Sequence, residues 1–204
     1  MRRTTAAEPT ALRASTSGLS ARRLHMVCEA FCAEHHEEWQ AYASLQVGDA
    51  ATAHGLVGEL RSRLTLHWEH ALRQESVEGH AWKIFKEIVF EWLDQRGLEP
   101  ALARSAAPLR VFEDILGACR PAAPGSVRAG AHRTEPRLRL YAAVAGLPER
   151  QYDVLLLRYV LQYDQARTAF IMGVPQETVR SHIRHAKRKL ALDLGLTWVP
   201  SPGE

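Results

Sequence analysis

The sequence predicts an all-α protein of two small helical domains joined by a proline-rich linker. Three observations support this fold class. Apolar residues recur at helical spacing in residues 24–97 and again in residues 137–194, no segment alternates as a strand does, and five prolines fall within residues 98–136. With 204 residues, 46% of them hydrophobic, the chain is long enough to bury real cores.

The predicted boundaries follow changes in composition along the chain. The first segment carries five arginines among Ala, Ser and Thr, and it lacks the apolar stretch of an export signal. The proline-rich segment is expected to contain one short helix over residues 111–119. The predicted parts are a disordered basic arm (1–23), a helical domain (24–97), a linker (98–136), a second helical domain (137–195) and a tail (196–204).

Charge is divided unevenly between the two helical segments. The net charge of +3 is the sum of segments with opposite charge. Residues 28–99 are acidic, with six Lys/Arg and thirteen Asp/Glu. Residues 137–190 are basic, with ten Lys/Arg and four Asp/Glu. A polyanion would therefore bind the second segment and avoid the first.

The sequence also predicts where the protein works. The longest uninterrupted aliphatic run, residues 154–157, is far shorter than the roughly eighteen residues that a membrane span needs. Three cysteines are an odd and sparse set, which is typical of reduced thiols. We therefore expect a cytoplasmic, nucleoid-associated protein without a membrane span.

The second helical segment contains a predicted helix-turn-helix. Asp164 can cap a short helix over residues 165–172, Gly173 supplies the turn, and Pro175 starts a longer helix that ends near Leu190. A further helix opens at Pro148. The residues expected to be buried are Tyr152, Leu155, Leu156, Tyr159 and Val160 in that helix and Val179, Ile183, Ala186 and Leu190 in the last one.

The last predicted helix carries polar and basic side chains opposite its apolar stripe. Arginine can pair with guanine, serine and threonine can bond several bases, and glutamate can accept from cytosine, whereas the lysines suit phosphates. A solvated cationic helix is the alternative, but the short preceding helix and the glycine turn favour nucleic-acid binding. The predicted DNA-binding residues are Gln176, Glu177, Thr178, Arg180, Ser181, Arg184, His185, Lys187, Arg188 and Lys189.

Three short segments carry a resemblance to a known family. LPERQ at residues 147–151, LLLRY at residues 155–159 and GVPQETVRSH at residues 173–182 resemble region 4 of the extracytoplasmic-function type of bacterial sigma factor. The resemblance implies binding to the upstream promoter element in the major groove, with promoter DNA, core RNA polymerase and an anti-sigma factor as partners. The sequence departs from the family pattern at Thr168, where a buried aliphatic residue is usual, and at His182 and His185, where arginines are common.

The N-terminal helical segment resembles region 2 of the same family. GDAATAHGLVGE at residues 48–59 is similar in its residue pattern to the helix that binds the polymerase clamp. Residues 81–93 resemble the helix that captures the downstream promoter element, but acidic residues such as Glu87 and Glu91 would repel phosphates there. The polymerase-binding residues that the resemblance implies are His54, Leu56, Val57, Glu59 and Leu60.

Histidines and cysteines cluster near the start of the first helical domain, at His25, Cys28, Cys32, His35 and His36. On one helix the outer two would lie roughly 16 Å apart, at about 1.5 Å per residue, so four of them cannot converge on one zinc. A site with two ligands, or one shared between chains, is the alternative. Since no HExxH motif or phosphate-binding glycine loop is present either, we expect no metal, no cofactor and no enzymatic activity.

Together these features predict a divergent sigma factor that directs RNA polymerase to promoters and binds specific DNA through its C-terminal helix-turn-helix. Two alternatives remain open. TVRSH at residues 178–182 also resembles the LuxR-type helix-turn-helix of transcriptional regulators, in which case residues 24–97 would be a sensor or dimerisation module. A sigma-like interaction protein that titrates a partner is the other alternative.

Overall fold

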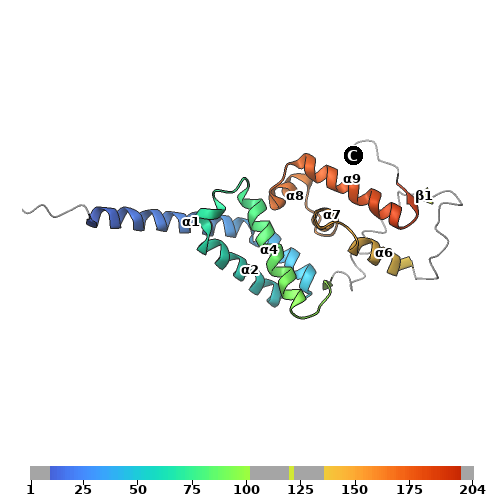
Figure 1. Cartoon of the computed structure of the whole chain (residues 1–204), viewed down its shortest axis with the longest axis horizontal. Helices are drawn as coiled ribbons and strands as arrows, with labels where there is room; N and C mark the ends of the chain where they lie inside the picture. The colour runs from blue at the N-terminus through green and yellow to red at the C-terminus, as the bar shows by residue number, and fades with distance from the viewer. Residues whose placement is uncertain (1–9, 102–119, 122–135, 199–204) are drawn as a thin grey trace, which may run out of the picture.

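The computed structural model describes residues 10–101, 120–121 and 136–198, and the described chain is almost entirely helical (Figure 1). The predicted all-α fold is confirmed, and the sheet within these ranges is an antiparallel pair of two-residue strands. The predicted short helix at 111–119 lies outside the described residues. The elements are α1 (Thr10–Val47), α2 (Ala50–Leu66), α3 (Trp68–Ala71), α4 (Val77–Asp94), β1 (Arg120–Pro121), α6 (Pro136–Ala145), α7 (Glu149–Leu155), the π-helical turn η2 (Leu156–Val160), α8 (Gln165–Met172), α9 (Gln176–Asp193) and β2 (Leu196–Thr197).

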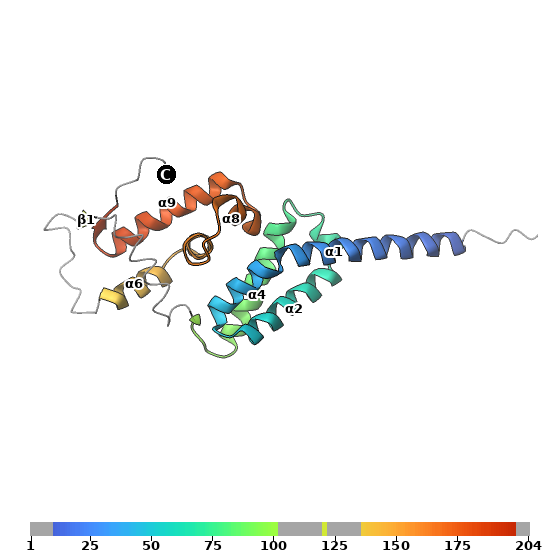
Figure 2. The same cartoon turned by 180° about the vertical axis from the view of Figure 1, so that it is seen from behind.

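Helix α1 is longer than the sequence analysis predicted. It begins at Thr10 and runs for 38 residues, and its first part projects beyond the other helices (Figures 1 and 2). The structure thus includes residues 10–23 in α1, where the sequence analysis expected a disordered arm. Alanine, leucine and arginine are strong helix formers, no proline interrupts this stretch, and the helix can continue outward from its packed part.

The N-terminal half is a bundle in which α1, α2 and α4 share one core. Asp49 caps α2 by accepting a hydrogen bond from the Thr52 amide at 2.7 Å, and Ser76 caps α4 by accepting one from the Gly79 amide at 2.9 Å. Aromatic side chains fill the centre of the bundle, where large rings bury much apolar area. Its buried residues include Trp39, Tyr42, Ala53, Leu56, Val57, Leu60, Leu64, Trp68, Trp82, Phe85, Ile88 and Val89.

The C-terminal half contains the predicted helix-turn-helix. Asp164 caps α8 by accepting a hydrogen bond from the Arg167 amide at 2.7 Å, as expected. Gly173 ends α8 in the left-handed conformation, with φ 61° and ψ 41°, which glycine adopts without a Cβ clash. The predicted apolar stripe of α9 is confirmed, because Val179, Ile183, Ala186 and Leu190 are all buried.

The helix before α8 differs from the prediction. The expected buried face repeated at helical spacing, whereas the structure buries five residues in a row, 153–157, and leaves Tyr152, Tyr159 and Val160 half-buried. The π-helical turn η2 explains part of the difference, because its wider turns shift the phase of the helix. The apolar residues of this run belong to the continuous core cluster, and α7 packs against α9.

The two halves pack against each other instead of standing apart on a linker. Buried apolar residues from both halves form one continuous cluster, and α4 of the first half lies against α8 of the second (Figure 1). This arrangement was not predicted, since the sequence indicated two domains without indicating a contact between them.

Candidate nucleic-acid interface

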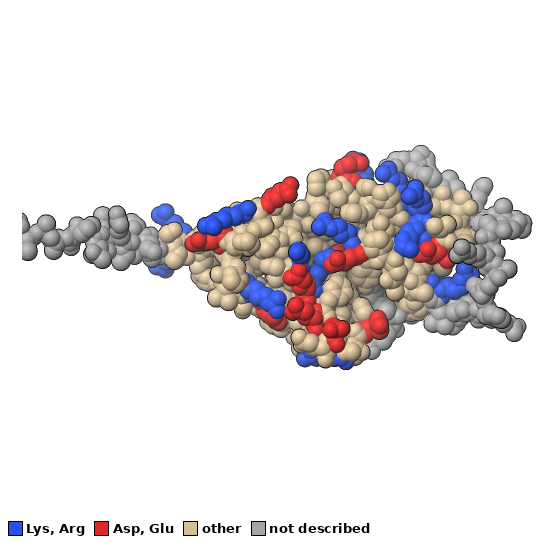
Figure 3. Space-filling model, viewed as in Figure 1, with Lys and Arg blue, Asp and Glu red and all other residues tan. Residues whose placement is uncertain are grey.

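Helix α9 presents a row of cations to solvent. Arg180, Arg184 and Arg188 are exposed and follow one another at intervals of four residues, so they share one face of the helix. That face lies opposite the buried stripe, and Lys and Arg side chains gather over α9 in the space-filling view (Figure 3). The arrangement offers a phosphate backbone several point charges along one line.

None of the ten predicted DNA-binding residues is buried. Two of the half-buried residues have partners that fix their position: Lys187 lies over the Tyr159 ring, 5.3 Å from its centroid, and Lys189 pairs with Asp193 at 2.9 Å. The exposed members are Gln176, Glu177, Arg180, Arg184, His185 and Arg188, and the half-buried members are Thr178, Ser181, Lys187 and Lys189.

The first turn of α9 contains an ion pair between Glu177 and Arg180, one helical turn apart. The pair is exposed, so it contributes little to stability. Its effect is positional, because Glu177 holds the Arg180 guanidinium beside the start of the helix. The residues at this end contact base edges when a helix of this kind enters the major groove.

His182 lies on the flank of α9 and is half-buried. Burial lowers its pKa, and the positive charges of Arg150 and His185 lower that pKa further. The imidazole is therefore uncharged near neutral pH. At a position where the resemblance implies arginine, this chain thus adds no positive charge to the helix.

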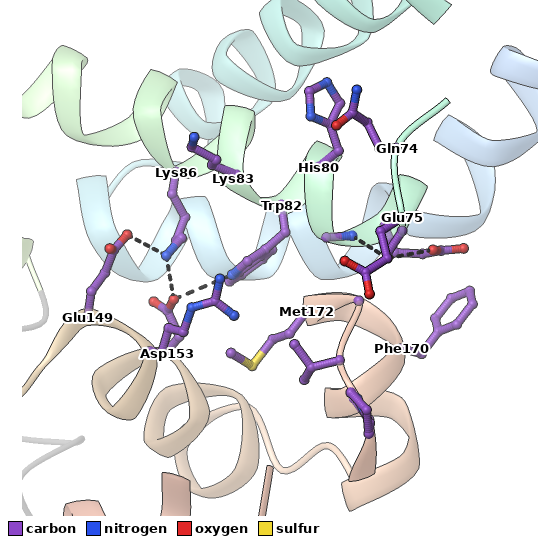
Figure 4. Close-up of a pocket in the computed structure, with 18 residues that line it drawn as sticks. Gln74, Glu75, His80, Trp82, Lys83, Lys86, Glu149, Asp153, Phe170 and Met172 are labelled. Carbon is purple, nitrogen blue, oxygen red and sulfur yellow. Dashed lines mark hydrogen bonds and ion pairs between the residues drawn. The ribbon is translucent and has the colours of Figure 1, made fainter. Parts of the chain in front are cut away.

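A buried carboxylate joins the two halves, and the sequence analysis missed it. Asp153 of α7 is fully buried and accepts a hydrogen bond from Tyr42 Oη at 2.9 Å. It also accepts hydrogen bonds from Trp82 Nε1 at 3.4 Å and Lys86 Nζ at 2.7 Å (Figure 4). Lys86 also pairs with Glu149. Burial raises the pKa of Asp153, and the Lys86 ammonium offsets part of that rise. The signal in the sequence was a single acid inside a buried apolar run.

A second polar contact lies on the other side of the interface. Arg167 of α8 donates through Nε to Glu38 of α1 at 2.7 Å, and its Nη2 donates to the Glu34 carbonyl at 3.2 Å. Beside it, the Phe170 ring stacks on His35 with centroids 4.7 Å apart. Burial lowers the pKa of His35, so its ring is neutral and packs as an aromatic side chain.

The turn of the helix-turn-helix touches the N-terminal half directly. A Cβ added at Gly173 would lie 2.5 Å from the Gly79 Cα and closer still to the Gly79 nitrogen and the Ser76 Oγ. Only glycine permits so close an approach of two backbones. Next to this contact lies an open cavity of about 960 Å³, lined by residues of both halves, including Glu75, Lys86 and Pro175 (Figure 4).

The predicted polymerase-binding residues divide into two groups. Leu56, Val57 and Leu60 belong to the buried core of the N-terminal bundle, so they do not lie on its surface in this conformation. Their side chains pack against α1 and α4 because they lie on the inner face of α2. Only His54 and Glu59 of that set are exposed.

The histidines and cysteines of the predicted cluster lie in different surroundings in the structure, some buried and some exposed. Cys28 and Cys32 point into the core, with Cys28 Sγ 3.8 Å from Thr65 Oγ1, whereas His25 is exposed. Burial raises the pKa of Cys32 to about 12, which keeps it a neutral thiol. Among the described residues, no group of three or more His, Cys, Asp or Glu side chains is placed to hold a metal ion.

A short helix, a left-handed glycine turn and a second helix with an exposed cationic face define the C-terminal half as a helix-turn-helix domain. More narrowly, residues 137–190, about a quarter of the chain, match the family described as Sigma-70, region 4. The predicted resemblance to a sigma factor is thereby confirmed.

Two further comparisons complete this result. The solved structure of the sigma factor RpoE in complex with the anti-sigma factor NepR from Bartonella quintana is similar to this chain, with 17% sequence identity and a TM-score of 0.38 over 81% of this chain and 97% of that one. No curated protein matches the chain. Within the described ranges, no helix has the length and apolar character that crossing a bilayer requires.

Proposed function

We propose that this protein is a divergent sigma factor that guides RNA polymerase to promoters, with α9 as the helix that contacts promoter bases. The observation that carries the proposal is the exposed row of Arg180, Arg184 and Arg188 on the second helix of a sigma region 4 domain. The proposed activity is binding, with no catalytic step, and it takes place where the chromosome is, in the cytoplasm.

The side chains of α9 suit two different tasks. Arg184 and Ser181 lie near the middle of the helix, where they can reach base edges, and arginine pairs with guanine through two hydrogen bonds. Arg188, near the end of the helix, is better placed for a phosphate. The first task gives sequence preference, and the second holds the domain on the duplex.

Replacing Arg184 with alanine is expected to weaken binding to the preferred duplex by about 1 to 3 kcal/mol. The preferred duplex is first selected with the wild-type chain from randomised sequences, and affinity is measured by fluorescence anisotropy at a fixed salt concentration. Arg73→Ala, which removes an exposed arginine from the acidic half, is the matched control and should leave affinity unchanged. An equal loss on a scrambled duplex would contradict base recognition by Arg184.

The second proposed partner is core RNA polymerase. The full chain is expected to co-elute with purified bacterial core polymerase and to support run-off transcription from the selected duplex joined to a reporter sequence. Arg184→Ala should retain co-elution and lose specific transcripts, because it alters DNA contact alone. Co-elution with no specific transcript from any template would argue for a sigma-like interaction protein.

A second candidate function is a DNA-binding regulator that does not direct polymerase. Two observations favour it: Leu56, Val57 and Leu60 are buried, and α4 exposes Glu87 and Glu91 where a promoter-opening helix would need cations. Such a regulator would bind the selected duplex alone and would not co-elute with polymerase. The same two measurements therefore separate the candidates.

A further inference from the structure

Two histidines from neighbouring helices lie against each other at the surface of the N-terminal half. His36 of α1 and His54 of α2 have ring centroids 6.0 Å apart, and their ring planes are nearly perpendicular, at 79°. His36 is half-buried and His54 is exposed, so an ion from solvent can reach both rings.

The pair belongs to a regular line of contacts between α1 and α2, which run side by side in opposite directions (Figure 2). Four residues along each helix from the two rings, Gln40 donates through Nε2 to the Ala50 carbonyl at 3.0 Å. Seven residues in the other direction, Arg61 donates through Nε to Glu29 at 3.1 Å. Equal steps along two antiparallel helices cover equal distances, so these contacts fix the register of α1 and α2 on both sides of the histidine pair.

The side chain of Gln40 holds an acceptor without a partner. Because its Nε2 donates to Ala50, the other end of the amide is the oxygen, and this Oε1 is buried with no hydrogen-bond partner in the described part of the chain. A buried acceptor of this kind is costly, and a bound water or ion commonly satisfies it. Gln40 follows His36 by four residues, so the two side chains share one face of α1.

The distance between the two rings suits one bound metal ion. A zinc–nitrogen bond of about 2.1 Å and roughly 1.1 Å from the nitrogen to the ring centre put each centroid about 3.2 Å from the ion. Two such arms span at most about 6.4 Å, so rings 6.0 Å apart can share one ion, and a small rotation of the exposed His54 side chain narrows the angle further. The surrounding segment, residues 28–99, has thirteen Asp/Glu against six Lys/Arg and therefore attracts cations.

We infer that His36, His54 and the Gln40 oxygen bind a divalent transition-metal ion of the zinc type, with water completing its coordination. Imidazole nitrogen is a preferred ligand of zinc and its neighbours in the first transition row, whereas Mg²⁺ prefers oxygen ligands. The site shares only His36 with the histidine and cysteine cluster predicted from the sequence. Its ligands come from both helices, so the ion holds α1 against α2. The inference goes beyond the proposed function, since α9 takes no part in it.

Isothermal titration calorimetry of the full chain, carrying no polyhistidine tag, tests the site. We expect one Zn²⁺ to bind per chain and excess Mg²⁺ not to displace it. His54→Gln and His36→Gln each remove a nitrogen ligand and should weaken Zn²⁺ binding at least about tenfold. Gln40→Leu removes the oxygen ligand and should cause a smaller loss.

The matched control is His70→Gln, which should leave Zn²⁺ affinity unchanged. The His70 ring also lies against a second histidine, His80, with centroids 5.5 Å apart. Its Nε2, however, is already 3.0 Å from Gln74 Nε2. The control therefore makes the same substitution at a histidine pair whose nitrogen has a partner.

Histidine modification gives a second measurement that needs no variant. Diethyl pyrocarbonate modifies imidazoles that hold no metal, and mass spectrometry locates the modified residues. Added Zn²⁺ is expected to protect His36 and His54 and to leave His70 reactive.

Other results overturn the inference. If His36→Gln and His54→Gln bind Zn²⁺ as the wild-type chain does, or if Zn²⁺ protects neither ring, the ion is not held by this pair. If Mg²⁺ competes equally, the site does not select a transition metal. An unchanged affinity in Gln40→Leu excludes its oxygen as a ligand. None of these measurements involves DNA, so their failure is distinct from a failure of the proposed function.

Discussion

Asp153→Ala is expected to lower the free energy of unfolding by about 3 kcal/mol, because it removes the buried carboxylate that pairs with the Lys86 ammonium and leaves that buried charge only the exposed Glu149. Tyr42 and Trp82 lose their acceptor at the same time. Since all three donors belong to the N-terminal half, the loss falls on the contact between the halves. Urea denaturation followed by tryptophan fluorescence measures the change.

Asp193→Ala is the control for that substitution. It removes an aspartate of the same half whose partner, Lys189, lies at the surface, so the expected loss is at most about 1 kcal/mol. The double variant Asp153→Leu, Lys86→Met should recover part of the stability, because it leaves no buried charge unpaired. Equal losses for Asp153→Ala and Asp193→Ala would show that the buried cluster does not hold the halves together.

Gly173→Ala is expected to have the second large effect, a loss of more than about 2 kcal/mol in the free energy of unfolding. An L-residue in the left-handed conformation costs roughly 1 to 2 kcal/mol by itself. The added Cβ would also overlap the Gly79 backbone, so α4 or the turn must move. The substitution should therefore loosen the interface, visible as faster hydrogen exchange at the start of α4.

Gly97→Ala separates the two causes of that loss. Gly97 has nearly the same φ, 60°, but a Cβ there meets nothing within 4 Å. It should show the conformational cost alone, without faster exchange in α4. If both alanine variants lose the same free energy of unfolding, the close approach of Gly173 to Gly79 does not contribute to the loss.

The helix-turn-helix was predictable because its signals are local. Asp164 and Gly173 mark the ends of α8, and the stripe from Val179 to Leu190 repeats at the helical period. Each of these features depends on residues within a few positions of one another. The exposure of Arg184 follows from the same periodicity, since it lies opposite a buried stripe.

The interface was not predictable in this way, because its partners are far apart in the sequence. Asp153 bonds Tyr42 and Lys86, and Arg167 pairs with Glu38, and no local pattern links such positions. The region 2 resemblance implies partner contacts for Leu56 and Leu60, whereas their spacing of four residues is also that of a buried helix face, and the structure places both in the core.

The small strand pair has a consequence for the C-terminal half. Because Arg120 pairs with Thr197 and Pro121 with Leu196, the chain that precedes α6 is hydrogen-bonded to the segment that follows α9. The two ends of the helix-turn-helix half are therefore tied together, and a displacement of α9 carries the first strand with it.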